Sequence, residues 1–207
     1  MADRLSIYQG ALRLLGPSQL ASLTEDRPER HKLDAAWVNA IDFLLEQGLW
    51  NFGIRTIEIQ ASEDVEPLFG YDYAFTKPDD WIRTAGISPT GIFSNDEPFN
   101  DFEDQAGSWF ANPQTLYIQY MSKDAAYGWN VGAWRQNFAK AAEAYLAFEC
   151  GLPISADRGN RNDLYNLFKE RLARAKNLDA VDERVRRKPT GCLVRSRLAG
   201  RGSLMNG

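Results

Sequence analysis

The chain has 207 residues, of which 44% are hydrophobic, and a formal net charge of −4. This length suits a single domain with one hydrophobic core. Two cysteines and one histidine cannot form a zinc cluster, and no apolar segment approaches the ~20 residues that span a bilayer. We therefore expect a soluble protein of a reducing compartment that stays where it is made.

Two amphipathic helices are predicted near the start of the chain. Residues 3–15 carry apolar side chains at intervals of three and four, and Gly16 ends this helix. The second helix covers residues 28–49, and its apolar face consists of Leu33, Trp37, Ile41, Leu44, Leu45 and Leu49. We expect the segment 33–52 to be the element around which the rest of the chain packs.

The residues before the second helix are polar and can cap it. Thr24, Glu25 and Asp26 precede Pro28 and are candidates for the N-cap and for first-turn carboxylates. His31 is the only histidine and lies on the charged side of the same helix, so we expect a solvated side chain.

The pattern of residues 52–122 predicts a β-rich insertion. Ile57 and Ile59 alternate with polar residues, the segment 71–75 alternates in the same way, and the segment 115–121 is the clearest strand. The carboxylate pair Asp79 and Asp80 follows a proline in a turn, which favours a capping role over acid–base chemistry or metal binding.

The segment 88–113 is predicted to leave the core as a long loop or a hairpin arm. It is rich in glycine, proline and asparagine, and its acidic residues are Asp96, Glu97, Asp101, Glu103 and Asp104. Their spacing lacks the Asp-x-Asp-x-Asp-Gly loop of calcium sites. We expect no metal here.

The second half of the chain is predicted to be helical. Trp134, Phe138, Ala142 and Tyr145 form a stripe on a helix at 131–151, which Gly151 and Pro153 end. A second helix at 163–187 is highly charged, with a buried line made of Leu164, Leu167, Phe168, Leu172, Ala175 and Leu178. Acidic residues alternate with its basic ones, which favours a solvated face with ion pairs over a DNA-binding face.

Residues 184–207 have a charge opposite to that of the rest of the chain. They hold seven of the 24 basic residues and none of the 28 acidic ones, so residues 1–183 have 17 basic residues against 28 acidic ones and a formal charge of −11. This composition predicts an interaction arm for an acidic protein surface or a nucleic acid, with a solvated chain end as the alternative. The apolar residues Leu193, Val194 and Leu198 favour docking on a protein.

No catalytic residue, metal ligand or cofactor site is predicted. Ser-His-Asp and Cys-His catalysis require a histidine beside the nucleophile, and His31 has no nucleophile motif near it. No phosphate-binding glycine loop follows a predicted strand. We expect a protein that is not an enzyme.

Several short motifs occur in an order that resembles the tail tubular protein A family, the head-to-tail adaptors of tailed phages. They are ALRLLG at 11–16, SLTED at 22–26, LWNF at 49–52, GYDYAFTKPDDWIR at 70–83 and LYIQYM at 116–121. The likeness continues through the helix around Trp134 and a charged last helix with a basic tail, and it covers nearly the whole chain.

The resemblance implies an α+β fold: a bundle of about four helices with an inserted small antiparallel β-sheet region and an extended C-terminal arm. Residues 1–183 would form the adaptor domain and residues 184–207 the arm. The subunits of the family assemble as a dodecameric ring beneath the portal protein, and the other side of the ring receives the tail nozzle or another tail protein. Double-stranded DNA passes through the ring without sequence recognition. The resemblance thus implies a virion protein of the phage neck, assembled in the host cytoplasm, with no membrane partner.

The arm is the expected portal-binding site. Its residues are Arg184, Arg186, Arg187, Leu193, Val194, Arg195, Arg197 and Leu198. Leu193, Val194 and Arg197 would occupy the places of a Trp-Leu pair and an Arg in the arms of the family. The acidic residues of the segment 96–104 would face the lumen, where they repel DNA, or the tail.

Two other functions stay open from the sequence. A DNA-binding accessory protein could use the basic arm together with aromatic stacking. A tail-associated hydrolase could use a pair of carboxylates, since 28 acidic residues always allow some pair.

Overall fold

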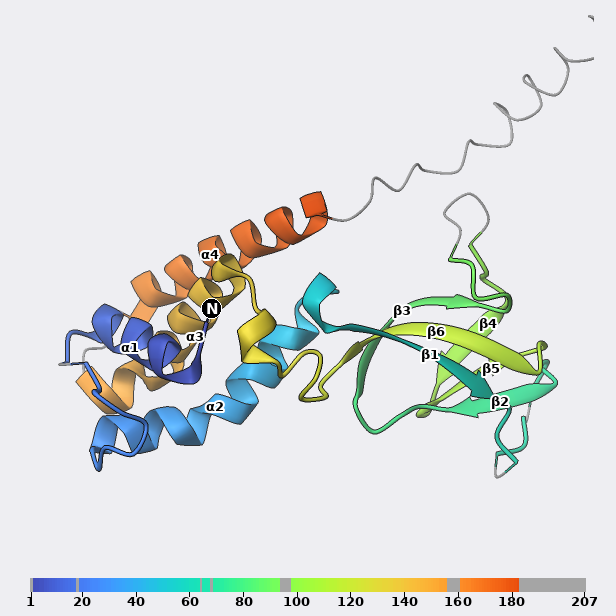
Figure 1. Ribbon diagram of the computed structural model, residues 1–207, viewed down its shortest axis with the longest axis horizontal. Helices are drawn as coiled ribbons and strands as arrows, with labels where there is room; N and C mark the ends of the chain where they lie inside the picture. Colours follow the sequence, from blue (N-terminus) through green and yellow to red (C-terminus); the bar gives the residue numbers. More distant parts are fainter. Residues whose placement is uncertain are drawn as a thin grey trace, which may run out of the picture. The chain divides into compact units, whose positions relative to one another are not determined.

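The computed structural model describes residues 2–17, 19–63, 65–67, 69–93, 98–155 and 161–182. Within these ranges, four α-helices and six strands confirm the expected α+β class (Figure 1). The helices are α1 (Arg4–Leu15), α2 (Pro28–Glu46), α3 (Gln136–Ser155) and α4 (Arg161–Asp182). The strands are β1 (Ile54–Gln60), β2 (Tyr73–Thr76), β3 (Trp81–Ser88), β4 (Phe102–Gln105), β5 (Ser108–Ala111) and β6 (Thr115–Ser122).

The described chain divides into two compact units. The helical unit contains Met1–Thr56, Pro78–Ala85 and Gln119–Glu183, and the β unit contains Ile57–Lys77 and Gly86–Ile118. Strands β1, β3 and β6 each contribute residues to both units. All six strands lie between α2 and α3 in the sequence, as expected of an insertion into the helical bundle.

Helix α3 is the centre of the helical unit, because it packs against α1, α2 and α4. This corrects the expectation that the segment 33–52 holds that place. Buried alanines lie on several sides of α3, outside the expected stripe: Ala139, Ala141, Ala144 and Ala147. Small side chains let neighbouring helices approach from several directions, and a helix that is apolar on most sides is buried. The segment 33–52 remains a core element, with Leu33, Ile41 and Leu44 fully buried.

The bounds of α3 differ from the predicted range 131–151. A short 3-10 helix at Val131–Ala133 precedes α3, which begins at Gln136. The helix also continues through Gly151 and ends at Ser155. Gly151 therefore does not end the helix, and a Cβ on it would make ordinary van der Waals contacts with Leu164 of α4 at 3.4 Å and with Leu15 of α1 at 3.5 Å.

The start and the end of α2 also correct two expectations. The N-cap is Arg27 in an extended conformation, without a side-chain cap, and Asp26 binds His31 instead. The helix ends at Glu46, so its periodicity does not extend to Leu49, which is only partly buried. Trp50 fills the core position beyond the helix end.

Helix α1 has the predicted pattern of buried residues. Helix α4 differs from its own predicted pattern near its C-terminal end. Asp3 and Ser6 form a capping box for α1, and Gly16 ends it in the left-handed region at φ 91°. In α4 the buried position of the last turns is Asp179 and not Leu178. Asp179 accepts a hydrogen bond from the Asn51 backbone N–H at 3.1 Å, which explains why a carboxylate is buried there.

The strands form two three-stranded antiparallel sheets, in the orders β1-β6-β3 and β2-β5-β4. Leu116, Ile118 and Tyr120 are buried together on one face of β6, as predicted. Strands β4 and β5 form a hairpin in which Phe102 pairs with Ala111. The hairpin alternative is therefore confirmed for residues 102–111. The expectation that the segment leaves the core is wrong for β5, because Trp109, Phe110 and Ala111 are buried.

Gly128 lies where any side chain would overlap the backbone. Its N–H donates to the Ser122 carbonyl at 3.1 Å, and a Cβ would overlap the same oxygen. We expect Gly128→Ala to lower the free energy of unfolding by about 3 kcal/mol, because backbone atoms cannot move aside as a side chain can. Urea unfolding of the full chain measures this effect.

Gly132→Ala is the matched control. A Cβ at Gly132 would meet only the Asn130 side chain, at 3.4 Å. Its effect should stay within about 0.5 kcal/mol. Equal effects of the two substitutions would show that the overlap at Gly128 is relieved by movement of the chain.

Candidate functional site

The acidic segment of the β unit is the part of the predicted site that the structure describes. Asp101 directly precedes β4, and Glu103 lies within it. Both residues are exposed, and neither forms an ion pair with another described residue. Strand β4 is at the edge of its sheet in the order β2-β5-β4. Charged side chains at such an edge oppose aggregation through edge-to-edge pairing, and they also present a negative surface.

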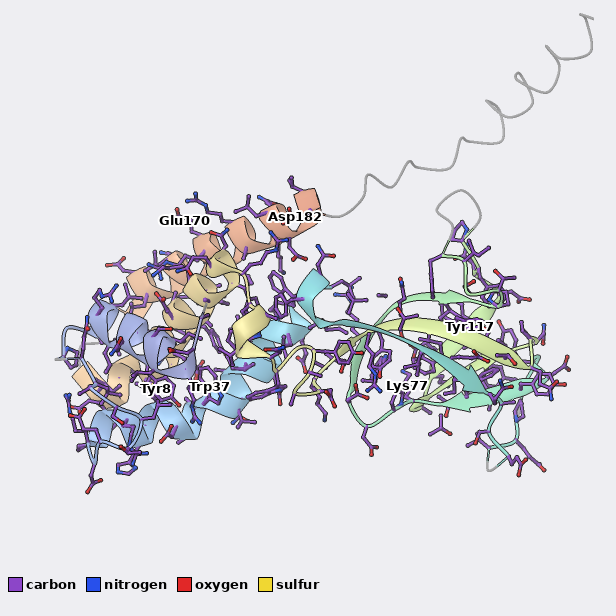
Figure 2. The ribbon with its side chains drawn as sticks, in the orientation of Figure 1. Tyr8, Trp37, Lys77, Tyr117, Glu170 and Asp182 are labelled. Carbon is purple, nitrogen blue, oxygen red and sulfur yellow. The ribbon has the colours of Figure 1, made fainter. Side chains whose placement is uncertain are left out.

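Asp104 differs from its neighbours because it is neutralised within the β unit. It forms an ion pair with Lys77. Lys77, labelled in Figure 2, follows β2. The Trp109 indole N–H donates to the second carboxylate oxygen at 3.1 Å, and the Lys77 ammonium lies 5.4 Å from the Trp109 ring centre. The Lys77 side chain is only 8% exposed. Asp104 thus stabilises the hairpin. The exposed and unpaired negative charge of the described segment comes from Asp101 and Glu103.

The turn of the hairpin determines where these carboxylates point. Ala106 and Gly107 connect β4 to β5 with φ values of 50° and 82°. Two successive positive φ angles are the requirement of a two-residue type I′ hairpin turn. This turn sets the register in which Asp104 pairs with Trp109. The exposed Glu103 is therefore presented by a fixed strand and not by an irregular loop.

The other predicted site residues lie outside the described residues. They are Asp96 and Glu97 of the acidic segment, and Arg184, Arg186, Arg187, Leu193, Val194, Arg195, Arg197 and Leu198 of the arm. The described chain ends on α4 at Asp182, which forms an ion pair with Arg135. The last turn of α4 carries the exposed apolar side chains Leu178 and Val181.

A polar network around Asp80 was missed by the sequence reading. The carboxylate of Asp80 accepts hydrogen bonds from Tyr120 at 3.0 Å, from Arg55 at 3.0 Å and from the Ser122 hydroxyl. The Asp80 carbonyl also accepts from the Lys123 N–H at 2.7 Å. We call Asp80, Arg55, Tyr120 and Ser122 the Asp80 network. Asp80, which directly precedes β3, therefore joins residues of β1 and β6 within the helical unit, which corrects its expected role as a cap.

The electrostatics of the Asp80 network fit a structural role. Burial disfavours the Asp80 carboxylate, but the hydrogen bonds from Ser122, Arg55 and Tyr120 outweigh it and hold its pKa below the usual value. Burial and the bond to Asp80 raise the pKa of Tyr120. The carboxylate therefore stays charged and the phenol neutral at physiological pH. No sequence signal marks this group, because Asp80 lies 25 to 42 residues from the side chains that it binds.

Two further searches concern the described residues alone. Within the described ranges, no group of three or more His, Cys, Asp or Glu is placed to hold a metal ion. None of the described helices is both long enough and apolar enough to cross a membrane.

Comparisons with known proteins give no assignment. No family model matches the chain, and a search of the curated proteins finds no match.

Proposed function

We propose that this protein is a structural adaptor of a phage virion, assembled as a dodecameric ring that joins the portal protein to the tail. The observation that carries the proposal is the arrangement of the fold. Six strands are inserted between α2 and α3 of a four-helix bundle. This is the arrangement that the resemblance to the tail tubular protein A family implies.

The distribution of charge supports two different contact surfaces. The arm is strongly basic, whereas the rest of the chain has a formal charge of −11. Opposite charges accelerate and orient protein association, so an arm of this sign would dock on an acidic portal surface. Asp101 and Glu103 would repel phosphates in a DNA channel, where binding requires neutralisation by Lys or Arg. The tail nozzle or another tail protein would bind the other side of the ring.

Imaging of assemblies tests the proposal directly. The purified full chain is examined by negative-stain microscopy, with and without the portal protein of the same phage. We expect rings attached to the portal. Mixtures that contain separate monomers and portals at all concentrations would contradict the proposal.

Deletion of the residues after Arg187 should leave a folded subunit that no longer binds the portal. The deletion removes Leu193, Val194, Arg195 and Arg197 but none of the described helices. Co-sedimentation with the portal measures binding, and circular dichroism measures folding. Deletion of residues 203–207 is the control, because it keeps every basic residue of the arm and should keep binding. A chain that ends at Arg187 and still sediments with the portal would assign the contact elsewhere.

The alternative is a DNA-binding accessory protein that uses the same basic arm. Seven basic residues without an acidic one favour this alternative as well. It requires binding to free duplex with an affinity that falls steeply as salt rises. A gel-shift titration against salt separates the two functions, because the adaptor should bind the portal and not free duplex.

A further inference from the structure

A basic hollow lies between α3 and α4 of the helical unit. Its volume is about 160 Å³, and it is lined by Asn137 and Lys140 of α3 and by Arg171 and Arg174 of α4. Three of these four side chains are cations. An amide and two guanidinium groups around a small hollow are suited to hold one oxyanion.

The hollow keeps a positive charge after its internal ion pairs are counted. Glu143, on the same helix as Lys140, accepts hydrogen bonds from the Lys140 ammonium at 3.0 and 3.1 Å. Arg171 lies 3.7 Å from the same carboxylate. Glu143 therefore pairs with two of the three cations, and its single negative charge does not neutralise all three. Glu143 is only 9% exposed, because α1 covers it at Gly10, where a Cβ would overlap the carboxylate.

Arg174 is the cation that the rest of the helical unit does not use. Its side chain is exposed and forms no ion pair or hydrogen bond with any described residue. Arg171 differs, because it also donates to the Lys140 carbonyl at 3.1 Å. Glu143 thus binds Lys140 and Arg171, and it leaves Arg174 without an ion-pair partner among the described residues.

The surface beside the hollow continues along α4 with apolar side chains. Arg171, Arg174, Leu178 and Val181 follow one another at intervals of three and four residues, so they share one side of the helix. Val181 is 78% exposed and Leu178 39% exposed. A basic hollow next to exposed apolar residues is a surface for a protein partner, since apolar contacts add nothing to binding of a free ion.

The acidic edge of the β unit complements this surface. Asp101 and Glu103 are exposed and have no ion-pair partner among the described residues. In an extended segment, carboxylates two residues apart are separated by about 7 Å. Arginines three residues apart on a helix have Cβ atoms about 5–6 Å apart, and their long side chains can adjust to that spacing. The two pairs thus match in number, charge and separation.

We propose that the hollow between α3 and α4 receives Asp101 and Glu103 of a second copy of this chain. This inference rests on the proposed ring. In a ring, the hollow of one copy would bind the acidic strand of the next copy, and this head-to-tail contact repeats until the ring closes. Arg174 and Arg171 bind the two carboxylates, and Leu178 and Val181 pack at the border of the contact.

Charge reversal in the full chain tests the contact. Sedimentation velocity at low salt measures self-association of Arg174→Glu, of Glu103→Arg and of the chain with both substitutions. We expect each single reversal to weaken self-association about tenfold or more, because like charges then face each other. The chain with both substitutions should regain most of the association of the wild type. Lys176→Glu is the control on α4, since Lys176 is exposed but does not line the hollow, and it should associate like the wild type.

Each other result overturns the inference. Arg174→Glu that associates like the wild type shows that the hollow is not in the contact. If both single reversals weaken self-association and the double variant does not regain it, Asp101 and Glu103 do not occupy the hollow. Arg174→Glu that assembles normally but loses the portal assigns the hollow to that partner. If Arg174→Glu still forms rings on the portal, only this inference is contradicted. If the wild type forms no assembly with or without the portal, the proposed function is contradicted as well.

Discussion

Trp50→Ala should lower the free energy of unfolding by about 3–5 kcal/mol, the range for loss of a large buried aromatic side chain. Trp50 is 1% exposed and lies in an aromatic cluster with Phe52, Phe138 and Trp134. Its ring centre lies 4.8 Å from that of Phe138, with the edge of one ring on the face of the other. The indole N–H also donates to the Leu44 carbonyl at 2.9 Å, so Trp50 satisfies the last turn of α2. Urea unfolding of the full chain measures the loss.

Two other substitutions separate the causes of this effect. Trp50→Phe keeps most of the apolar contacts but removes the donor to Leu44, and it should cost about 1–2 kcal/mol. Val38 lies on α2 at 53% exposure, and Val38→Ala should change the free energy of unfolding by no more than about 0.5 kcal/mol. If Trp50→Ala were as mild as Val38→Ala, the aromatic cluster would not be part of the stabilising core.

Asp80→Ala should lower the free energy of unfolding by about 3 kcal/mol, because three donors lose a charged acceptor at once. The hydroxyl of Tyr120 would then lie in a fully buried side chain without its partner. Arg55 is one-third exposed and can turn to water, so its share of the loss is the smallest. Thermal unfolding at neutral pH, compared with the wild type, measures the effect.

Asp80 also makes stability depend on pH in a defined direction. Its pKa is lower in the folded chain than in the unfolded chain, where an Asp has a pKa of about 3.9. The carboxylate therefore stabilises the fold above that value, and its contribution is lost as the pH falls through the folded-state pKa. Asp80→Ala should lose less stability on acidification than the wild type. Asp79→Ala is the control, because Asp79 is exposed beside Asp80 and should leave both the stability and its pH dependence unchanged. Identical acid profiles of the wild type and Asp80→Ala would contradict this role.

The proposed portal contact and the proposed contact between copies use different parts of the chain. We propose the first for residues 184–207 and the second for α3, α4 and the acidic strand. Variants of one part should therefore leave the other intact. This separation allows portal binding and self-association to be measured as independent properties of one protein.

The sequence by itself determined the elements and the class of the fold. The apolar periodicities of α1, α2 and α4 and the alternation in β6 are local patterns, and a local pattern is enough to bury one face of a helix or strand. Errors occurred where an element ends. The apolar spacing continued to Leu49, but α2 stops at Glu46, and Gly151 was read as a terminator although α3 continues beyond it. A glycine that ends a helix and a glycine within a helix look alike in a sequence.

Only the tertiary structure decided which residues meet. Asp80 binds partners 25 to 42 positions away, and Asp179 binds Asn51 across 128 positions. The central place of α3, the neutralisation of Asp104 by Lys77 and the hollow beside Arg174 have the same origin. The periodicity of a sequence indicates which side chains are buried, but it does not indicate which residues they contact. The pairing of charges depends on the packing of segments that are distant in sequence, and that packing is set by the shapes of all the side chains between them.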